Sequence, residues 1–146
     1  MTTPTLLDAA DVEWFVPGSP APQGSKRAFR NKRTGGVILT ESSKAVGPWR
    51  DRVALSAHNA MMGRALFDGA VGVCLNFVMP RPKSAPKSRT PKATKRPDVD
   101  KLARAILDSL TGVCFSDDSQ VVSLSAYKRI AEIGETAGVS IRVEEG

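Results

Sequence analysis

The apolar residues of one short segment alternate strictly with other residues, and this pattern constrains the fold more than any other feature of the chain. They are Val71, Val73, Leu75, Phe77 and Met79. A period of two predicts a β-strand over residues 71–79 with one face in a core. Between Val99 and Leu110 the apolar residues recur every three or four positions, which predicts a helix with one apolar stripe that ends before Gly112. Because each element has one apolar face to bury, the core must combine sheet and helix.

Weaker patterns extend this arrangement over the rest of the chain. Alternating runs predict strands over residues 12–16, 36–40, 121–130 and 139–143, and a Gly47-Pro48 entry predicts a helix that ends at Gly63. The chain has 146 residues, of which 41% are hydrophobic. We therefore predict one α/β (α+β) domain over residues 1–146, with helices packed on a mixed β-sheet and a loose N-terminus at residues 1–10.

Composition excludes several classes of protein. No apolar run approaches the ~20 residues that cross a bilayer, and the N-terminal segment lacks the basic and apolar regions of a signal peptide. We therefore expect a cytoplasmic protein with no membrane partner. The chain has two cysteines and one histidine. This argues against a disulfide framework and a zinc site, so a metal site would consist mainly of carboxylates.

The positive charge is concentrated in two segments. Residues 81–96, the basic loop, hold seven basic residues, three prolines and no acidic residue, and residues 26–33 hold five more basic residues. The net charge is +6, yet without these twelve the 21 lysines and arginines fall to nine, against 15 acidic residues. The prolines predict a flexible loop that exposes its cations. Such a loop is either solvated surface or a surface for a polyanion, and its internal position favours nucleic acid.

Asp98 and Asp100 lie where the basic loop meets the predicted helix. An aspartate at a helix N-terminus often caps free N–H groups and suits the helix dipole, which is the simpler interpretation. A single aspartate is enough to cap a helix, however, so capping does not explain the second one. Two carboxylates two residues apart can emerge on the same side of an extended or turning backbone, where they repel each other unless a cation lies between them.

Asp117 and Asp118 follow the helix, just before the strand predicted at residues 121–130. They are either an ordinary acidic turn or part of the same acidic cluster. We expect a strand that runs back beside the helix to bring this pair toward the end of the domain that holds Asp98 and Asp100. Carboxylate oxygens suit Mg²⁺ or Mn²⁺, and such an ion beside a basic loop is what metal-assisted phosphodiester hydrolysis needs.

The segment RPDVDKLARAILDSLTGVCFSDDSQVV resembles the signature of the RusA family of Holliday junction resolvases. It joins Pro-Asp-x-Asp, an amphipathic helix ending Leu-Asp-x-Leu, and Asp-Asp-Ser-Gln before a strand. The resemblance extends less tightly to GSPAPQGSKRAF, to the Gly-Pro-Trp-Arg helix entry and to the strand with Lys128, from about Trp14 to Val143. It implies a small homodimeric endonuclease, dependent on Mg²⁺ with Mn²⁺ as a substitute, that nicks four-way DNA junctions symmetrically.

The resemblance also implies the catalytic residues. The family's essential aspartates fall on Asp98, Asp100 and Asp118, which we take as the metal ligands, with Asp117 in support. Arg104 stands where the family's characterised resolvase has lysine, and we expect it to stabilise phosphate charge in the transition state.

An arginine exchanges a proton poorly, so Lys101 or Lys128 is an alternative general acid. The simpler interpretation of Arg104 is a helix-stabilising pair with Asp100 or Asp108 at four-residue spacing. Other cations are expected to contact DNA. These are Lys26, Arg27, Lys83, Lys87, Arg89, Lys92, Lys95, Arg96, Lys101 and Lys128.

The main hypothesis is a structure-selective DNA endonuclease that resolves Holliday junctions in recombination and repair. Two alternatives stay open. One is a metal nuclease that acts on other branched DNA, and the other is a non-catalytic DNA-binding or architectural protein in which the aspartates are caps and turn residues. Two cuts in opposed strands favour a two-fold homodimer.

Overall fold

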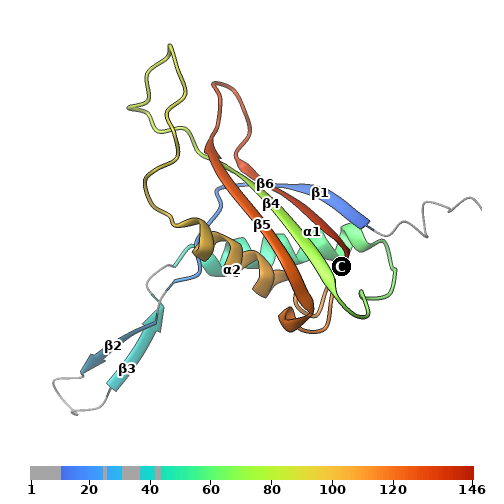
Figure 1. Ribbon diagram of the computed structural model, residues 1–146. Coiled ribbons are helices and arrows are strands. Elements are labelled where there is room, and N and C mark those ends of the chain that lie inside the picture. The colour runs from blue at the N-terminus through green and yellow to red at the C-terminus, as the bar shows by residue number, and fades with distance from the viewer. Residues whose placement is uncertain (1–10, 25, 31–36, 42–43) are drawn as a thin grey trace, which may run out of the picture.

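The computed structural model describes residues 11–24, 26–30, 37–41 and 44–146. They form a four-stranded mixed sheet in the order β1-β6-β4-β5, with α1 and α2 on one face (Figure 1). These elements are β1 (Asp11–Pro17), α1 (Val46–Met61), β4 (Val71–Met79), α2 (Val99–Leu110), β5 (Val121–Ile130) and β6 (Gly138–Glu145). The predicted α+β fold, with helices on a mixed sheet, is confirmed.

Two shorter elements complete the described chain. A separate hairpin consists of β2 (Lys26–Arg30) and β3 (Val37–Glu41), and the 3₁₀ helix η2 (Asp118–Gln120) precedes β5. The sequence predicts a strand near β3 but not β2, because the basic residues of β2 leave too few apolar positions for an alternating pattern. Residue 36 and the predicted loose N-terminus, residues 1–10, lie outside the described residues.

β4 is a strand over residues 71–79, as its alternating apolar residues predict, and it is one of the two inner strands of the sheet. It pairs with β6 in antiparallel and with β5 in parallel orientation. The side chains of Leu75 and Phe77 point into the core and are at most 1% exposed. The apolar stripe of α2 meets them there, since Leu102, Ile106 and Leu110 are fully buried.

The parallel pair β4 and β5 determines where α2 lies. Parallel strands cannot be joined by a tight hairpin, so the chain must cross over between them. Here the crossover consists of the basic loop, α2 and η2. α2 therefore runs antiparallel to both strands, and its first turn lies beside their C-terminal ends. None of the helices that the structure describes is both long and apolar enough to span a membrane.

We predict that Gly18→Ala destabilises the domain by about 1–3 kcal/mol. Gly18 has φ +138°, and a Cβ there would lie 3.0 Å from the Trp49 ring and 3.2 Å from the Arg52 guanidinium. Chemical unfolding measures the change. Ser88→Ala, at an exposed position where the side chain makes no hydrogen bond to a described residue, is the control and should stay within about 0.5 kcal/mol of the parent chain. A Gly18→Ala protein as stable as this control would contradict the prediction.

A second prediction concerns the turn between β5 and β6. The Arg129 guanidinium makes two 2.6 Å hydrogen bonds to the Glu135 carboxylate and lowers the pKa of Glu135 from 4.5 to about 2. Because the folded pKa lies below the unfolded one, the pair stabilises the fold above pH 4.5, and this contribution is lost as the pH falls toward 2. Arg129→Gln should raise the Glu135 pKa, measured by carboxyl NMR, whereas Arg142→Gln should leave it unchanged.

Candidate functional site

Asp98 and Asp100 are free carboxylates at the N-terminus of α2. Asp98 holds the N-cap position with extended backbone (φ −72°, ψ 141°), but its side chain accepts no hydrogen bond from the helix. Asp100 lies in the first turn. Both are exposed, and neither side chain forms a hydrogen bond or ion pair with any residue that the structure describes. The helix-cap interpretation of Asp98 is therefore wrong, and both carboxylates are available to a ligand.

Arg104 connects α2 to Asp118. Its Nη1 lies 2.6 Å from Oδ2 of Asp118 and 3.8 Å from Oδ1 of Asp108. Of the two helix pairs considered from the sequence, the one with Asp108 is present and the one with Asp100 is not. The half-exposed guanidinium offsets the charge of Asp118 and can move to another anion, because solvent reaches both partners.

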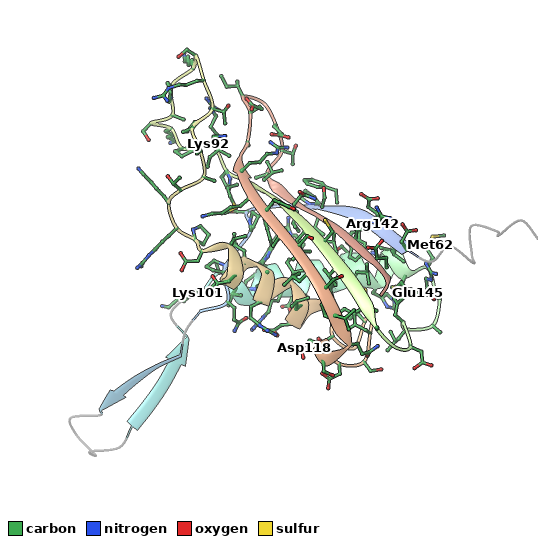
Figure 2. The ribbon with its side chains drawn as sticks, viewed as in Figure 1. Met62, Lys92, Lys101, Asp118, Arg142 and Glu145 are labelled. Carbon is green, nitrogen blue, oxygen red and sulfur yellow. The ribbon has the colours of Figure 1, made fainter. Side chains whose placement is uncertain are left out.

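The expectation that the strand after the helix would bring Asp117 and Asp118 to the end with Asp98 is wrong within one chain. Because β5 runs antiparallel to α2, its beginning lies beside the later turns of the helix and its end returns to the first turn. Asp118 accordingly contacts Arg104, whereas Lys128 contacts Pro97. Figure 2 shows Lys101 near the start of α2 and Asp118 near its far end.

Asp117 has a structural role in this fold. It caps η2 by accepting a 2.9 Å hydrogen bond from the Ser119 N–H, which lowers the pKa of Asp117. The Gln120 side chain completes a capping box by accepting from the Asp117 N–H, and it donates to the carbonyl oxygens of Phe67 and Gly69. These contacts hold the chain just before β5 and so determine where Asp118 lies.

The donor chemistry at the start of α2 fits a hard divalent cation. Two free carboxylates supply oxygen ligands of the kind that Mg²⁺ and Mn²⁺ prefer, and cations usually complete such a shell with water and substrate oxygens. Over residues 11–24, 26–30, 37–41 and 44–146, no three His, Cys, Asp or Glu side chains form a group that could hold a metal. The ligand set Asp98, Asp100 and Asp118 therefore stays a prediction.

A cleft of about 1060 Å³ opens beside Asp98. Its walls are residues 19–24, the basic loop and the start of α2. Five of the cations predicted to contact DNA line it, namely Lys92, Lys95, Arg96, Lys101 and Lys128. Lys83, Lys87 and Arg89 are exposed elsewhere on the loop, and the side chains of Lys26 and Arg27 lie outside the described residues.

These features agree with the comparison to known families, in which residues 17–144 match the family described as Endodeoxyribonuclease RusA. The chain belongs to the RusA family. The resemblance predicted from its sequence is thereby confirmed, and membership suggests a nuclease. "Uncharacterized protein YqaN" of Bacillus subtilis (strain 168) is a relative, 29% identical over 130 residues that cover 83% of this chain and 89% of that protein.

Arg81 organises the basic loop of this RusA-family chain, a role that the sequence did not reveal. Its guanidinium donates to the carbonyl oxygens of Pro86, Arg89 and Ala131 and to Oγ1 of Thr90, over 2.6–3.1 Å. In turn Oγ1 of Thr90 donates to Glu132 at 2.5 Å. The basic loop, residues 81–96, contains no helix or strand, as predicted. Arg81 nevertheless holds the basic loop against the end of β5, because it binds carbonyls of the loop and of Ala131.

Gln23 is a second residue that sequence reasoning missed. Its backbone N–H donates to the Lys101 carbonyl at 2.9 Å, and its side-chain Oε1 accepts a 2.6 Å hydrogen bond from Arg50 of α1. These contacts attach residues 19–24, which form one wall of the cleft, to both helices. The segment GSPAPQGSKRAF, which contains Gln23, resembles the RusA family, and this resemblance could have drawn attention to Gln23. It does not indicate which residues Gln23 contacts.

Proposed function

We propose that this RusA-family protein is a Mg²⁺-dependent, structure-selective endonuclease that resolves Holliday junctions by paired symmetric nicks. The observation that carries the proposal is the position of two carboxylates, free among the described residues, at the start of α2, where Asp98 lines a cleft together with four lysines and one arginine. The cations attract the phosphate backbone and offset its repulsion from the carboxylates. Carboxylates without cations would repel DNA, and cations without carboxylates would only bind it.

In the proposed site Asp98 and Asp100 would hold Mg²⁺, with Mn²⁺ as a substitute. Because Asp118 of the same chain lies beside Arg104, Asp118 would be the third ligand only from the second subunit of the proposed homodimer. When bound, the ion polarises the phosphate and makes an attacking water more acidic. Both residues are exposed at the start of α2 and Asp98 lines the cleft, which supports this assignment because a phosphodiester in the cleft can reach Asp98.

Two further residues have separate roles in the proposed reaction: Arg104 stabilises charge and Lys101 donates a proton. Arg104 lies one turn beyond Asp100, and its guanidinium stabilises negative charge on the phosphate but exchanges a proton poorly. Of the two lysines considered as general acid, Lys128 already donates to two backbone carbonyls. Lys101 lines the cleft beside Asp98, and its ammonium makes no hydrogen bond to a described residue. We therefore assign protonation of the leaving oxygen to Lys101.

Recognition of the junction rests on shape and phosphate contacts. The cleft offers several cations and few aromatic side chains, which favours backbone contact over base stacking. A four-way junction has near two-fold symmetry and needs one cut in each of two opposed strands, so the active species is a homodimer.

Cleavage tests the proposal directly. The parent protein with Mg²⁺ should nick a labelled four-way junction, and Asp100→Asn should slow cleavage by about 100-fold or more, as expected for loss of an electrostatic group in an active site. Asp51→Asn, at an exposed position on α1, is the matched control and should cleave normally. If the parent cleaved no faster than Asp100→Asn, the protein would be a DNA binder instead. Flap and fork substrates test the other branched-DNA alternative.

The salt dependence of binding tests the role of the basic loop. Neutralising Lys87, Arg89, Lys92 and Lys95 together should weaken junction binding and reduce the slope of log K against log salt by about 0.9 for each phosphate that the loop no longer neutralises. Arg142→Gln, on the sheet face away from the helices, removes one charge from an ion pair with Asp11 and should leave the slope unchanged. An unchanged slope in the loop variant would remove the loop from the binding surface.

A further inference from the structure

Lys128 and Lys101 both line the cleft, yet their ammonium groups have different surroundings. Lys101 is exposed and makes no side-chain hydrogen bond to a described residue. Lys128 is half-buried on β5, and its Nζ donates to the carbonyl oxygens of Lys95 and Pro97, each at 2.8 Å. Hydrogen bonds from an ammonium are roughly twice as strong as neutral ones, so this contact costs energy to break.

The carbonyls that Lys128 holds belong to the segment leading into Asp98. Pro97 immediately precedes Asp98, and residues 80–98 have no helix or strand to fix their course. On the other side, the N–H of Gln23 donates to the Lys101 carbonyl. The start of α2 is thus attached to β5 through Lys128 and to the opposite cleft wall through Gln23.

We propose that Lys128 is a positioning residue for Asp98, and neither a phosphate contact nor a proton donor. The inference rests on the proposed nuclease function, in which Asp98 is a metal ligand. By holding two peptide carbonyls, Lys128 determines the direction in which the chain enters α2 and therefore where the Asp98 carboxylate lies. A small displacement of a ligand or reacting group costs far more in rate than in DNA affinity, because affinity is spread over many phosphate contacts.

Amine labelling of the unaltered protein tests the environment of Lys128 without any substitution. Reductive methylation followed by peptide mass spectrometry should modify Lys101 readily, and a four-way junction in Mg²⁺-free buffer should protect it. Lys128 should react slowly with and without the junction. A Lys128 that reacts as fast as Lys101 and is protected only by DNA would overturn the proposal.

Substitution tests the consequence for Asp98. Lys128→Met should lower kcat by at least ~10-fold while KM for the junction and the salt slope of binding in Mg²⁺-free buffer stay unchanged. Amide hydrogen exchange at Leu102, whose N–H donates to the Asp98 carbonyl at 3.1 Å, should become faster, and Lys128→Arg should recover part of kcat. In contrast, Lys101→Met should reduce the salt slope by about 0.9.

Two results of the substitutions would overturn the proposal: a salt slope that falls in Lys128→Met as it does in Lys101→Met, or a Lys128→Met protein with unchanged kcat and exchange. If Lys128→Met does not fold, the labelling result on the parent protein decides. If the parent protein cleaves no junction, the proposed function fails, whereas labelling, salt slope and amide exchange still report whether Lys128 holds residues 95–97.

Discussion

The parallel pairing of β4 with β5 is the constraint on which the arrangement of the site depends. It forces a crossover, and α2 within that crossover must bury its apolar stripe against the sheet. The chain direction of α2 follows from this, and so does the position of its first turn at the C-terminal ends of both strands. The basic loop leaves β4 at the same end. One backbone pairing therefore brings the cations and the two free aspartates together.

Proline explains why side-chain cations hold the loop in place. Residues 80–98 are rich in proline, which has no N–H to donate to a loop carbonyl. Arg81 donates to the carbonyls of Pro86 and Arg89, and Lys128 donates to those of Lys95 and Pro97. Two positive charges are thus used to shape the surface on which the other cations are displayed. Counting charges in this segment overestimates the number available to phosphate.

The four aspartates around α2 have the same side chain but different contacts, and these contacts decide which of them can bind a ligand. Asp98 and Asp100 have no partner among the described residues, Asp118 is paired with Arg104, and Asp117 caps η2. A free carboxylate can bind a cation at little cost, whereas Asp118 must first exchange its arginine for another partner. In the proposed function, a phosphate near the Arg104 guanidinium would compete with Asp118 for it.

Linear patterns in the sequence were enough to predict the two main helices, every strand except β2, and the family. Period-two and period-3.6 patterns arise from local backbone geometry, so Val71 to Met79 and Val99 to Leu110 were predicted with their observed bounds. The signature around Asp98, Asp100 and Asp118 identified the family for the same reason, since it is a linear pattern.

Which of these side chains meet depends on long-range contacts. Strand order and direction depend on contacts between residues far apart in the chain, and a linear pattern contains no record of them. The sequence therefore could not show that Asp118 lies beside Arg104, that Asp98 leaves its helix uncapped, or that Lys128 and Arg81 bind backbone carbonyls. The chemistry of each residue was readable from its type, while its partner was set by the pairing of β4 with β5.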